Sequence, residues 1–281
     1  MIITGGSSGI GKATAHKIAA AGGVPILVAR TQQKLDDVVD EIQAQGGTAY
    51  AYSCDLSDMD AIEDCVERIF ADHAAVDMLV NNAGRSIRRG VKLSYDRFHD
   101  YERTIRLNYL GAVKMILGVL PHMTERKFGH IVNVSSIGAQ TNPPRFSAYV
   151  ASKAALDAFT RVVSSETIGD NVTFTTIHMP LVKTPMIAPT KMYDSFPTIT
   201  PDEAADLVCE AIRAKPKTIN TRLGTFGEVL YAIAPKAVDQ ILHMAYKVFP
   251  ESAAAKGQKD PKEKASNEAT ALAYLMRGVH W

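Results

Sequence analysis

The chain has 281 residues, of which 46% are hydrophobic, and its 31 basic and 30 acidic side chains leave a formal net charge of +1. This composition supports a substantial core and excludes electrostatic capture of nucleic acid. The three cysteines lack metal-ligand spacing, and no apolar run is long enough to span a bilayer. We therefore expect a soluble, cytoplasmic protein with no disulfide framework and no metal site.

The chain opens with a short apolar strand, residues 1–3, followed by a glycine-rich turn and a helical pattern through Ala21. Glycines at 5, 9 and 11 permit a tight turn, a close approach of backbone to a pyrophosphate, and close packing of helix on strand. The free N–H groups of the helix start then face the phosphates. We predict a dinucleotide site formed by Thr4, Gly5, Ser7, Ser8, Gly9, Ile10 and Gly11.

The second predicted strand, residues 24–29, ends at Arg30. An acidic residue near the end of this strand would bind a ribose 2′-hydroxyl, whereas a basic residue accommodates a 2′-phosphate. No carboxylate stands there, and Lys34 follows Arg30 by one helical turn. The sequence therefore favours NADPH over NADH, although a solvated arginine at a helix start is the alternative.

Helices and strands continue to alternate after this point. Asp55 and Leu56 follow the third strand at its carboxyl end, where open α/β sheets bind ligands. The fourth strand ends in Asn81, Asn82, Ala83 and Gly84, whose small residues let a cofactor ring lie close to the backbone. The basic loop from Ser86 to Arg89 is either a solvated turn or a contact for an anionic part of a substrate. The predicted segments are a helix over 31–45, a strand over 49–54, a helix over 58–73 and a strand over 76–80.

A long helical stretch, residues 98–120, carries Asn108 in an apolar setting, where a buried amide needs hydrogen-bonding partners. Residues 130–134 then form a predicted buried strand that ends just before Ser136. A hydroxyl at this position could hold a substrate carbonyl.

Tyr149 and Lys153 are spaced i, i+4 on a helix that reaches Thr167, so they share one face. An ammonium beside a phenol favours the phenolate and brings its pKa closer to the working pH of a general acid or base. Taken alone, this spacing also fits a surface tyrosine and lysine on an amphipathic helix.

The sixth strand, residues 172–178, leads into a proline-rich apolar loop, residues 179–198, that could act as a lid. Thr200, Pro201 and Glu203 form a strong helix start, with the helix reaching Ala214 and a last strand over 218–222. The alternation of strands and helices predicts an α/β doubly wound parallel sheet, a Rossmann fold, over residues 1–222.

These motifs, in this order, resemble the short-chain dehydrogenase/reductase family. The resemblance rests on Thr4-Gly5-x-x-x-Gly9-x-Gly11, Asp55, Asn81-Asn82-Ala83-Gly84, Asn108, Ser136 and Tyr149-x-x-x-Lys153. It implies a tetrad in which Tyr149 donates a proton, Lys153 holds the ribose and lowers the pKa of Tyr149, and Ser136 positions the carbonyl. Asn108 would hold a water of a proton relay.

The resemblance further implies that Val182 and Thr184 contact the cofactor, with Thr184 at the nicotinamide carboxamide. It also implies a dimer or tetramer formed through the helices of Asn108 and Tyr149. Two departures stand out. Met179-Pro180 replaces the Pro-Gly pair usual before this loop, and only three residues precede Thr4. The short first strand suggests a start inside a longer or fused reductase.

A closer resemblance is to bacterial fatty acyl-CoA reductases of wax ester synthesis, which implies NADPH-dependent reduction of a long-chain acyl-CoA to the fatty aldehyde. Arg88, Arg89, Ser136 and Met186 are the candidate substrate contacts. No cysteine nucleophile is required, and Cys54, Cys65 and Cys209 are predicted core residues. The resemblance rests on residues 82–89, 145–153 and 179–182 through Thr190-Lys191, and on His280-Trp281.

Two alternatives remain open. One is a carbonyl reductase of 3-oxoacyl, steroid-like or small ketone substrates, which the tetrad fits equally well. The other is a catalytically silent NADPH-binding subunit or fragment of a larger reductase, against which the intact tetrad argues.

Residues 223–281 are predicted as a helical extension. One helix carries an apolar stripe of Phe226, Leu230 and Ile233, and a second starts at Pro235. A polar linker over 252–267 and a short docking helix over 268–281 follow. Along the second helix, Val238, Ile241, Leu242, Ala245 and Phe249 share a face.

These apolar residues favour packing on the core or on a partner subunit. The alternatives are a wall for an acyl chain and a peripheral membrane contact. For a membrane contact the polar face should be basic, and Lys236, His243 and Lys247 supply only part of such a face.

Overall fold

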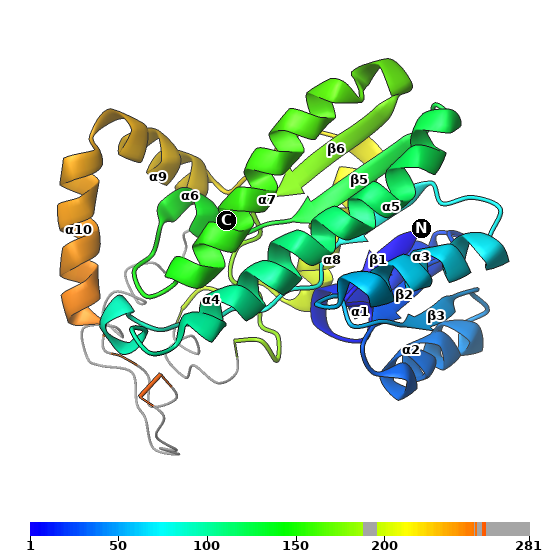
Figure 1. The fold of residues 1–281 in the computed structure, drawn as a ribbon, viewed down its shortest axis with the longest axis horizontal. Coiled ribbons are helices and arrows are strands. Elements are labelled where there is room, and N and C mark those ends of the chain that lie inside the picture. Colours follow the sequence, from blue (N-terminus) through cyan, green and yellow to red (C-terminus); the bar gives the residue numbers. More distant parts are fainter. Residues whose placement is uncertain (188–195, 250, 252–254, 257–281) are drawn as a thin grey trace.

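The computed structural model describes residues 1–187, 196–249, 251 and 255–256 (Figure 1). Its centre is one seven-stranded parallel sheet with the strand order β3-β2-β1-β4-β5-β6-β7. The strands are β1 (Ile2–Thr4), β2 (Ile26–Ala29), β3 (Tyr50–Ser53), β4 (Met78–Asn81), β5 (Gly129–Val134), β6 (Val172–Ile177) and β7 (Thr218–Ile219). The order reverses direction between β1 and β4, which is where ligands bind in sheets of this kind.

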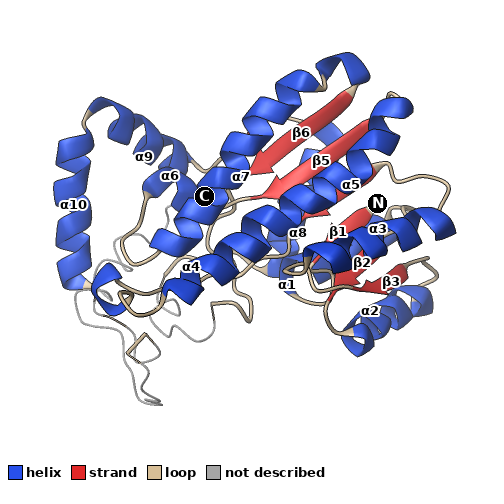
Figure 2. Ribbon diagram, in the orientation of Figure 1, coloured by secondary structure: helices blue, strands red, loops and turns tan. Residues whose placement is uncertain are grey.

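Six long helices cover the sheet, three on each face (Figure 2). Each buries one apolar stripe; for example, α2 buries Leu35, Val38 and Ile42. Strands covered on both faces are buried along their whole length, as β5 is, and its polar residues His130 and Asn133 have hydrogen-bond partners inside the protein. One face carries α1 (Gly9–Ala20), α2 (Gln32–Ala44) and α8 (Pro201–Ala214), and the other carries α3 (Met59–Asp72), α5 (Ala112–Glu125) and α7 (Ser147–Glu166). The predicted doubly wound fold is confirmed.

The long helix predicted over 98–120 is not continuous. It consists of α4 (Phe98–Ile105), a π-helical segment η2 (Arg106–Gly111) and α5. A Cβ atom at Gly111 would lie 2.2 Å from the carbonyl oxygen of Leu56, so the absence of a side chain lets η2 approach the end of β3. Such π segments insert one extra residue per turn and are frequent at functional sites.

The predicted start of α8 is confirmed in detail. Thr200 Oγ1 accepts a hydrogen bond from the N–H of Glu203 at 3.2 Å, and the Glu203 carboxylate accepts one from the N–H of Thr200 at 2.7 Å. The prediction that the last strand extends to Arg222 is wrong. The hydroxyl of Thr221 caps the N-terminus of α9, so Arg222 begins this helix and the strand ends at Ile219.

Two helices form an arm beyond the sheet, which we call the α9–α10 arm (Figure 1). It consists of α9 (Arg222–Ile233) and α10 (Pro235–Val248); the remaining short elements are η1 (Val91–Leu93), α6 (Gly138–Thr141) and η3 (Ile168–Asp170). Helix α9 packs on α6 through two glycines. A Cβ atom at Gly227 would lie 3.1 Å from Thr141 Cγ2, and one at Gly224 would lie 2.2 Å from Gln140 Oε1.

The sequence predicted that the apolar residues of the arm pack on the core or on a partner subunit, and three of them do not pack on the core; their packing on a partner subunit stays a prediction. Phe226, Ile233 and Ile241 are exposed, whereas Val238 is buried. Helical periodicity reports a shared face but not what covers it. The linker predicted over 252–267, apart from residues 255–256, and the docking helix predicted over 268–281 lie outside the described residues.

Three further sequence expectations concern the described part of the chain. Cys54 and Cys65 are buried as predicted, but Cys209 is only partly buried. None of the described helices is long and apolar enough to cross a membrane. Within the same residues, no group of three or more His, Cys, Asp or Glu side chains could hold a metal ion.

Candidate active site

The four tetrad residues meet at the carboxyl end of β5. Ser136 follows this strand, Tyr149 and Lys153 lie on α7, and Asn108 lies on the π-helical segment η2. A side-chain hydrogen bond joins Ser136 to Tyr149. Ser136 Oγ also accepts a hydrogen bond from the N–H of Gly138 at 3.0 Å. The serine hydroxyl is therefore held beside the phenol.

Lys153 is a buried cation, with only 4% of its surface exposed. Its Nζ donates a hydrogen bond to the carbonyl oxygen of Val134 at 2.7 Å. Burial lowers the pKa of Lys153 to about 8, and the negative charge of Asp157, one turn further along α7, works in the opposite direction. A lysine with this pKa can both hold and release a proton near neutral pH.

Burial also acts on Tyr149. It raises the pKa of the phenol, and the negative charge of Asp157 raises it too, while the hydrogen bond from Ser136 works in the lowering direction. The sequence predicted the opposite direction on the ground that a neighbouring ammonium stabilises a phenolate. The loss of solvent around the buried phenol is the largest influence on its pKa.

Asn108 is buried, and its carboxamide is fully engaged. Its Oδ1 accepts from the N–H of Arg85 at 2.8 Å, and its Nδ2 donates to the carbonyl oxygen of Arg85 at 2.8 Å and to Ser152 Oγ at 2.9 Å. Ser152 Oγ in turn donates to the carbonyl oxygen of Tyr149. The side chain thus fixes the loop after β4 to the first turn of α7.

The segment after β4 lies over the tetrad. A Cβ atom at Gly84 would be 3.4 Å from Asn108 Oδ1 and 3.6 Å from Lys153 Nζ. Thr4 holds this segment in place, because its hydroxyl accepts hydrogen bonds from the N–H groups of Asn82 at 2.9 Å and Ala83 at 3.0 Å. Gly84 therefore lies directly against Asn108 and Lys153.

The glycine-rich turn has the geometry expected of a phosphate-binding loop. Gly5 and Gly9 have φ angles of +67° and +54°, which residues with a side chain rarely adopt. A Cβ atom at Gly11 would lie 2.3 Å from the carbonyl oxygen of Gly5, so only glycine permits the close turn. A Cβ atom at Gly9 would lie 3.2 Å from Thr184 Cγ2, which places Thr184 beside the turn. These residues fit a dinucleotide.

Charged side chains gather at the carboxyl ends of β2 and β3. Asp55 Oδ1 accepts the N–H of Ser57 at 2.9 Å. Although burial works in the raising direction, this hydrogen bond and the charges of Arg30 and Arg85 hold the pKa of Asp55 below its ordinary value. Burial lowers the pKa of Arg85, and the nearby charges of Arg103 and Arg30 lower it further.

Arg85 was not among the predicted site residues. The only sequence signal for it is a basic residue directly after Gly84. Because the side chains of Arg30 and Arg85 both act on Asp55, they share one positive region at the end of β2 and β3. Lys34, also predicted to bind the cofactor, is exposed on the first turn of α2.

The family model described as short chain dehydrogenase matches residues 1–193. The chain belongs to the short-chain dehydrogenase family. It is 52% identical over 280 residues to the fatty acyl-CoA reductase of Acinetobacter baylyi, an alignment that covers 100% of this chain and 94% of that protein. The similarity to fatty acyl-CoA reductases inferred from the motifs is therefore confirmed.

Other relatives agree on the family. An uncharacterised oxidoreductase of Mycobacterium tuberculosis is 52% identical over 286 residues, which are 100% of this chain and 84% of that protein. A solved 3-oxoacyl (acyl-carrier-protein) reductase from Agrobacterium tumefaciens, with NADP bound, matches with a TM-score of 0.68 and 30% identity. That match covers 74% of this chain and 85% of the other.

Two of the predicted substrate contacts of this short-chain dehydrogenase, Arg89 and Met186, differ in how much of the protein surrounds them. Arg89 Nε lies 3.1 Å from Oδ2 of the buried Asp100, and its Nη1 donates to the carbonyl oxygen of Ala255. The backbone N–H of Arg89 donates to the carbonyl oxygen of Arg145 at 2.7 Å. Its guanidinium is therefore occupied in holding the loop. Met186 is exposed in the segment after Thr184. The roles predicted for Arg88, Arg89 and Met186 remain predictions.

Arg145 links the catalytic loop to the C-terminal part of the chain. It is buried, has a φ angle of +74°, and its Nε lies 3.0 Å from Glu251 Oε1. Its Nη2 donates to the carbonyl oxygen of Tyr246 at 2.8 Å, and its guanidinium lies 4.1 Å from the centre of the Tyr246 ring. Since Arg145 precedes Tyr149 by four residues, the arm is fixed to the loop that leads into α7.

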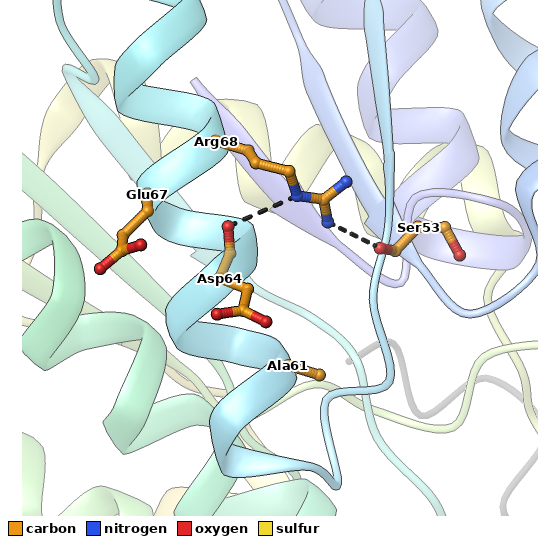
Figure 3. Close-up of a pocket in the computed structure, with 5 residues that line it drawn as sticks. All are labelled: Ser53, Ala61, Asp64, Glu67 and Arg68. Atoms are coloured by element: carbon orange, nitrogen blue, oxygen red, sulfur yellow. Dashed lines mark hydrogen bonds between the residues drawn. The ribbon is translucent and has the colours of Figure 1, made fainter.

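A separate hollow lies between β3 and α3, away from the tetrad (Figure 3). Arg68 crosses it, donating to the carbonyl oxygens of Asp64 at 3.4 Å and Ser53 at 3.2 Å. No predicted site residue lines this hollow. Its lining residues are Ser53, Ala61, Asp64, Glu67 and Arg68.

Proposed function

We propose that the protein is an NADPH-dependent reductase that converts a long-chain fatty acyl-CoA to the fatty aldehyde. The observation that carries the proposal is the 52% identity with a fatty acyl-CoA reductase over the whole chain. The tetrad supports it, because the hydroxyls of Ser136 and Tyr149 are hydrogen-bonded and the buried Lys153 lies one turn after Tyr149 on α7.

The charged residues at the end of β2 favour NADPH over NADH. No carboxylate stands at the end of β2, and Arg30 and Arg85 make that region positive, which suits a 2′-phosphate. The proposed cofactor contacts are Thr4, Gly5, Ser7, Ser8, Gly9, Ile10, Gly11, Arg30, Lys34, Asp55, Leu56, Asn82, Ala83, Gly84, Tyr149, Lys153, Val182 and Thr184, joined by Arg85. When bound, NADPH supplies a hydride to the substrate carbonyl carbon.

The protein's own residues handle the charge and the proton. As the thioester carbonyl is reduced, the oxygen becomes an oxyanion that Ser136 and Tyr149 stabilise by hydrogen bonds, and Tyr149 protonates it. The hemithioacetal then collapses, the carbon–sulfur bond breaks, and the CoA thiolate takes up a proton. Overall, acyl-CoA, NADPH and one proton give aldehyde, CoA and NADP⁺. Lys153 restores the proton on Tyr149, for which a pKa of about 8 is suited.

One competing function has a specific observation behind it. A solved structure similar to this chain is a 3-oxoacyl (acyl-carrier-protein) reductase. The same tetrad would reduce a ketone to an alcohol without breaking a carbon–sulfur bond. We propose residues 1–222 as the catalytic domain and 223–281 as an extension that distinguishes this chain from such reductases. We further expect the enzyme to work in the cytoplasm as a homo-oligomer.

The experiment is NADPH oxidation by the purified chain with palmitoyl-CoA, a 3-oxoacyl thioester and decanal in parallel. Turnover of palmitoyl-CoA with release of free CoA supports the proposed function. Turnover of the keto or aldehyde substrates alone would replace it with a carbonyl reductase. Tight NADPH binding without any turnover would indicate a silent subunit of a larger enzyme.

A further inference from the structure

The α9–α10 arm carries a stripe of exposed apolar residues that no described part of the chain covers. On each helix the exposed residues are spaced i, i+3, i+7, which places them on one face. They are between 39% and 77% exposed. The stripe consists of Phe226, Val229 and Ile233 on α9 and of Ile241, Met244 and Val248 on α10.

The other faces of both helices are already occupied. Helix α9 turns Gly224 and Gly227 towards α6. Helix α10 buries Val238, and the carbonyl oxygen of Tyr246 accepts the hydrogen bond from Arg145. The stripe therefore lies on the outward side of a firmly attached arm. Exposed apolar residues that lie together on an otherwise polar surface mark a contact with a partner protein or a membrane.

Cations border the apolar stripe on one side of α10. Lys236 and Lys247 are eleven residues apart, three turns of helix, so they share one side of α10, and Lys247 lies one turn after Met244. Arg222 is exposed at the start of α9.

Neither acidic residue of the arm lies on the apolar stripe. The Glu228 carboxylate accepts a hydrogen bond from Gln140 of α6 at 2.9 Å. Asp239 lies two residues before Ile241, on the opposite side of the helix, where its nearest basic neighbour is Lys236 one turn before it. An apolar stripe bordered by cations, with the acids turned away, complements an anionic lipid surface.

We propose that the α9–α10 arm binds the surface of a bilayer that contains anionic phospholipid. Arg145 ties the arm to the loop that leads into Tyr149, so a bound enzyme holds its catalytic loop near the lipid. A symmetric contact with a second copy fits less well, because the bordering lysines of the two copies would approach each other with no acid on the stripe to pair them. The inference that the arm binds a bilayer uses only the residues of the arm. The idea that this binding helps the enzyme reach a long-chain substrate rests on the proposed function.

The test is co-sedimentation of the full chain with vesicles of phosphatidylcholine, with and without phosphatidylglycerol. We expect wild type to bind the anionic vesicles and the I241D/M244D variant to lose about tenfold or more in binding. The K236E/K247E variant should lose its preference for phosphatidylglycerol. The matched control is I168D, which places an acid on another exposed apolar residue, in η3 after the C-terminal end of α7 and outside the arm, and should bind as wild type does.

Wild type that leaves both vesicle types unbound, or I241D/M244D that binds like wild type, would overturn the proposal. Gel filtration of the same variants tests the alternative that a second copy of the chain binds the stripe. If I241D/M244D lowers the oligomeric mass and vesicles bind neither protein, the stripe is an interface between copies. Binding is measured without substrate, so a failure of the palmitoyl-CoA assay leaves this result unaffected, and NADPH binding by every variant reports that each is folded.

Discussion

Replacing Lys153 by methionine should change how the stability of the cofactor-free protein depends on pH. Lys153 is almost fully buried, and burial lowers its pKa from 10.5 to about 8. That difference corresponds to about 3 kcal/mol, at about 1.4 kcal/mol for each pH unit. The methionine side chain has a similar length and carries no charge to bury.

The direction follows from proton counts. Below about pH 8 the lysine is charged in both the folded and the unfolded chain, so the folded state carries the full cost of the buried charge. Between the two pKa values the unfolded chain binds more protons, so wild-type stability rises with pH relative to the variant. The K153M variant also loses the hydrogen bond to Val134, but that loss does not vary with pH.

The assay is urea unfolding of both proteins at several pH values between about 7 and 10. We expect the free energy of unfolding of wild type, relative to K153M, to increase by about 2–3 kcal/mol over this range. The control is K34M, which removes an exposed lysine of α2 and should track wild type throughout. A difference between wild type and K153M that stays constant with pH, or shrinks, would refute a buried, charge-bearing Lys153.

Three further outcomes follow from the site. Tyr149→Phe should lower kcat by about 10²–10⁴-fold while NADPH binding, measured by fluorescence, stays near wild type; retained turnover would remove Tyr149 as the acid. Arg30→Ala should raise the KM for NADPH by about tenfold or more and leave that for NADH nearly unchanged, whereas a parallel rise in both would deny a 2′-phosphate contact. Asn108→Ala should destabilise the protein by about 1–3 kcal/mol in urea unfolding, because the backbone N–H and carbonyl groups of Arg85 lose their hydrogen-bond partners. An unchanged unfolding midpoint would contradict a stabilising role for these hydrogen bonds.

Much of this fold could be predicted from local patterns. The strands are short runs rich in apolar and β-branched residues, the helices carry one apolar face, and the start of α8 at Thr200 follows from a capping box. The glycine turn was predictable because Gly5, Gly9 and Gly11 each meet a local backbone requirement. The spacing of Tyr149 and Lys153 likewise fixes their relative position on a helix.

The features that escaped prediction depend on contacts between distant parts of the chain. The π-helical segment exists where Gly111 meets Leu56, and Arg85 acquires a role only when β2, β3 and the loop after β4 are side by side. The pKa of Tyr149 moved opposite to expectation because burial is a tertiary property. The exposure of Ile233 and Ile241 could not be read from periodicity either.

The most direct test of the central claim is product analysis with palmitoyl-CoA and NADPH. The thiol of free CoA, NADP⁺ and the sixteen-carbon aldehyde would be measured in the same reaction. We predict that all three appear in equal amounts, and that none appears with Tyr149→Phe. NADP⁺ formation without CoA release, or with 3-oxoacyl substrate alone, would contradict thioester reduction and assign the site to ketone reduction.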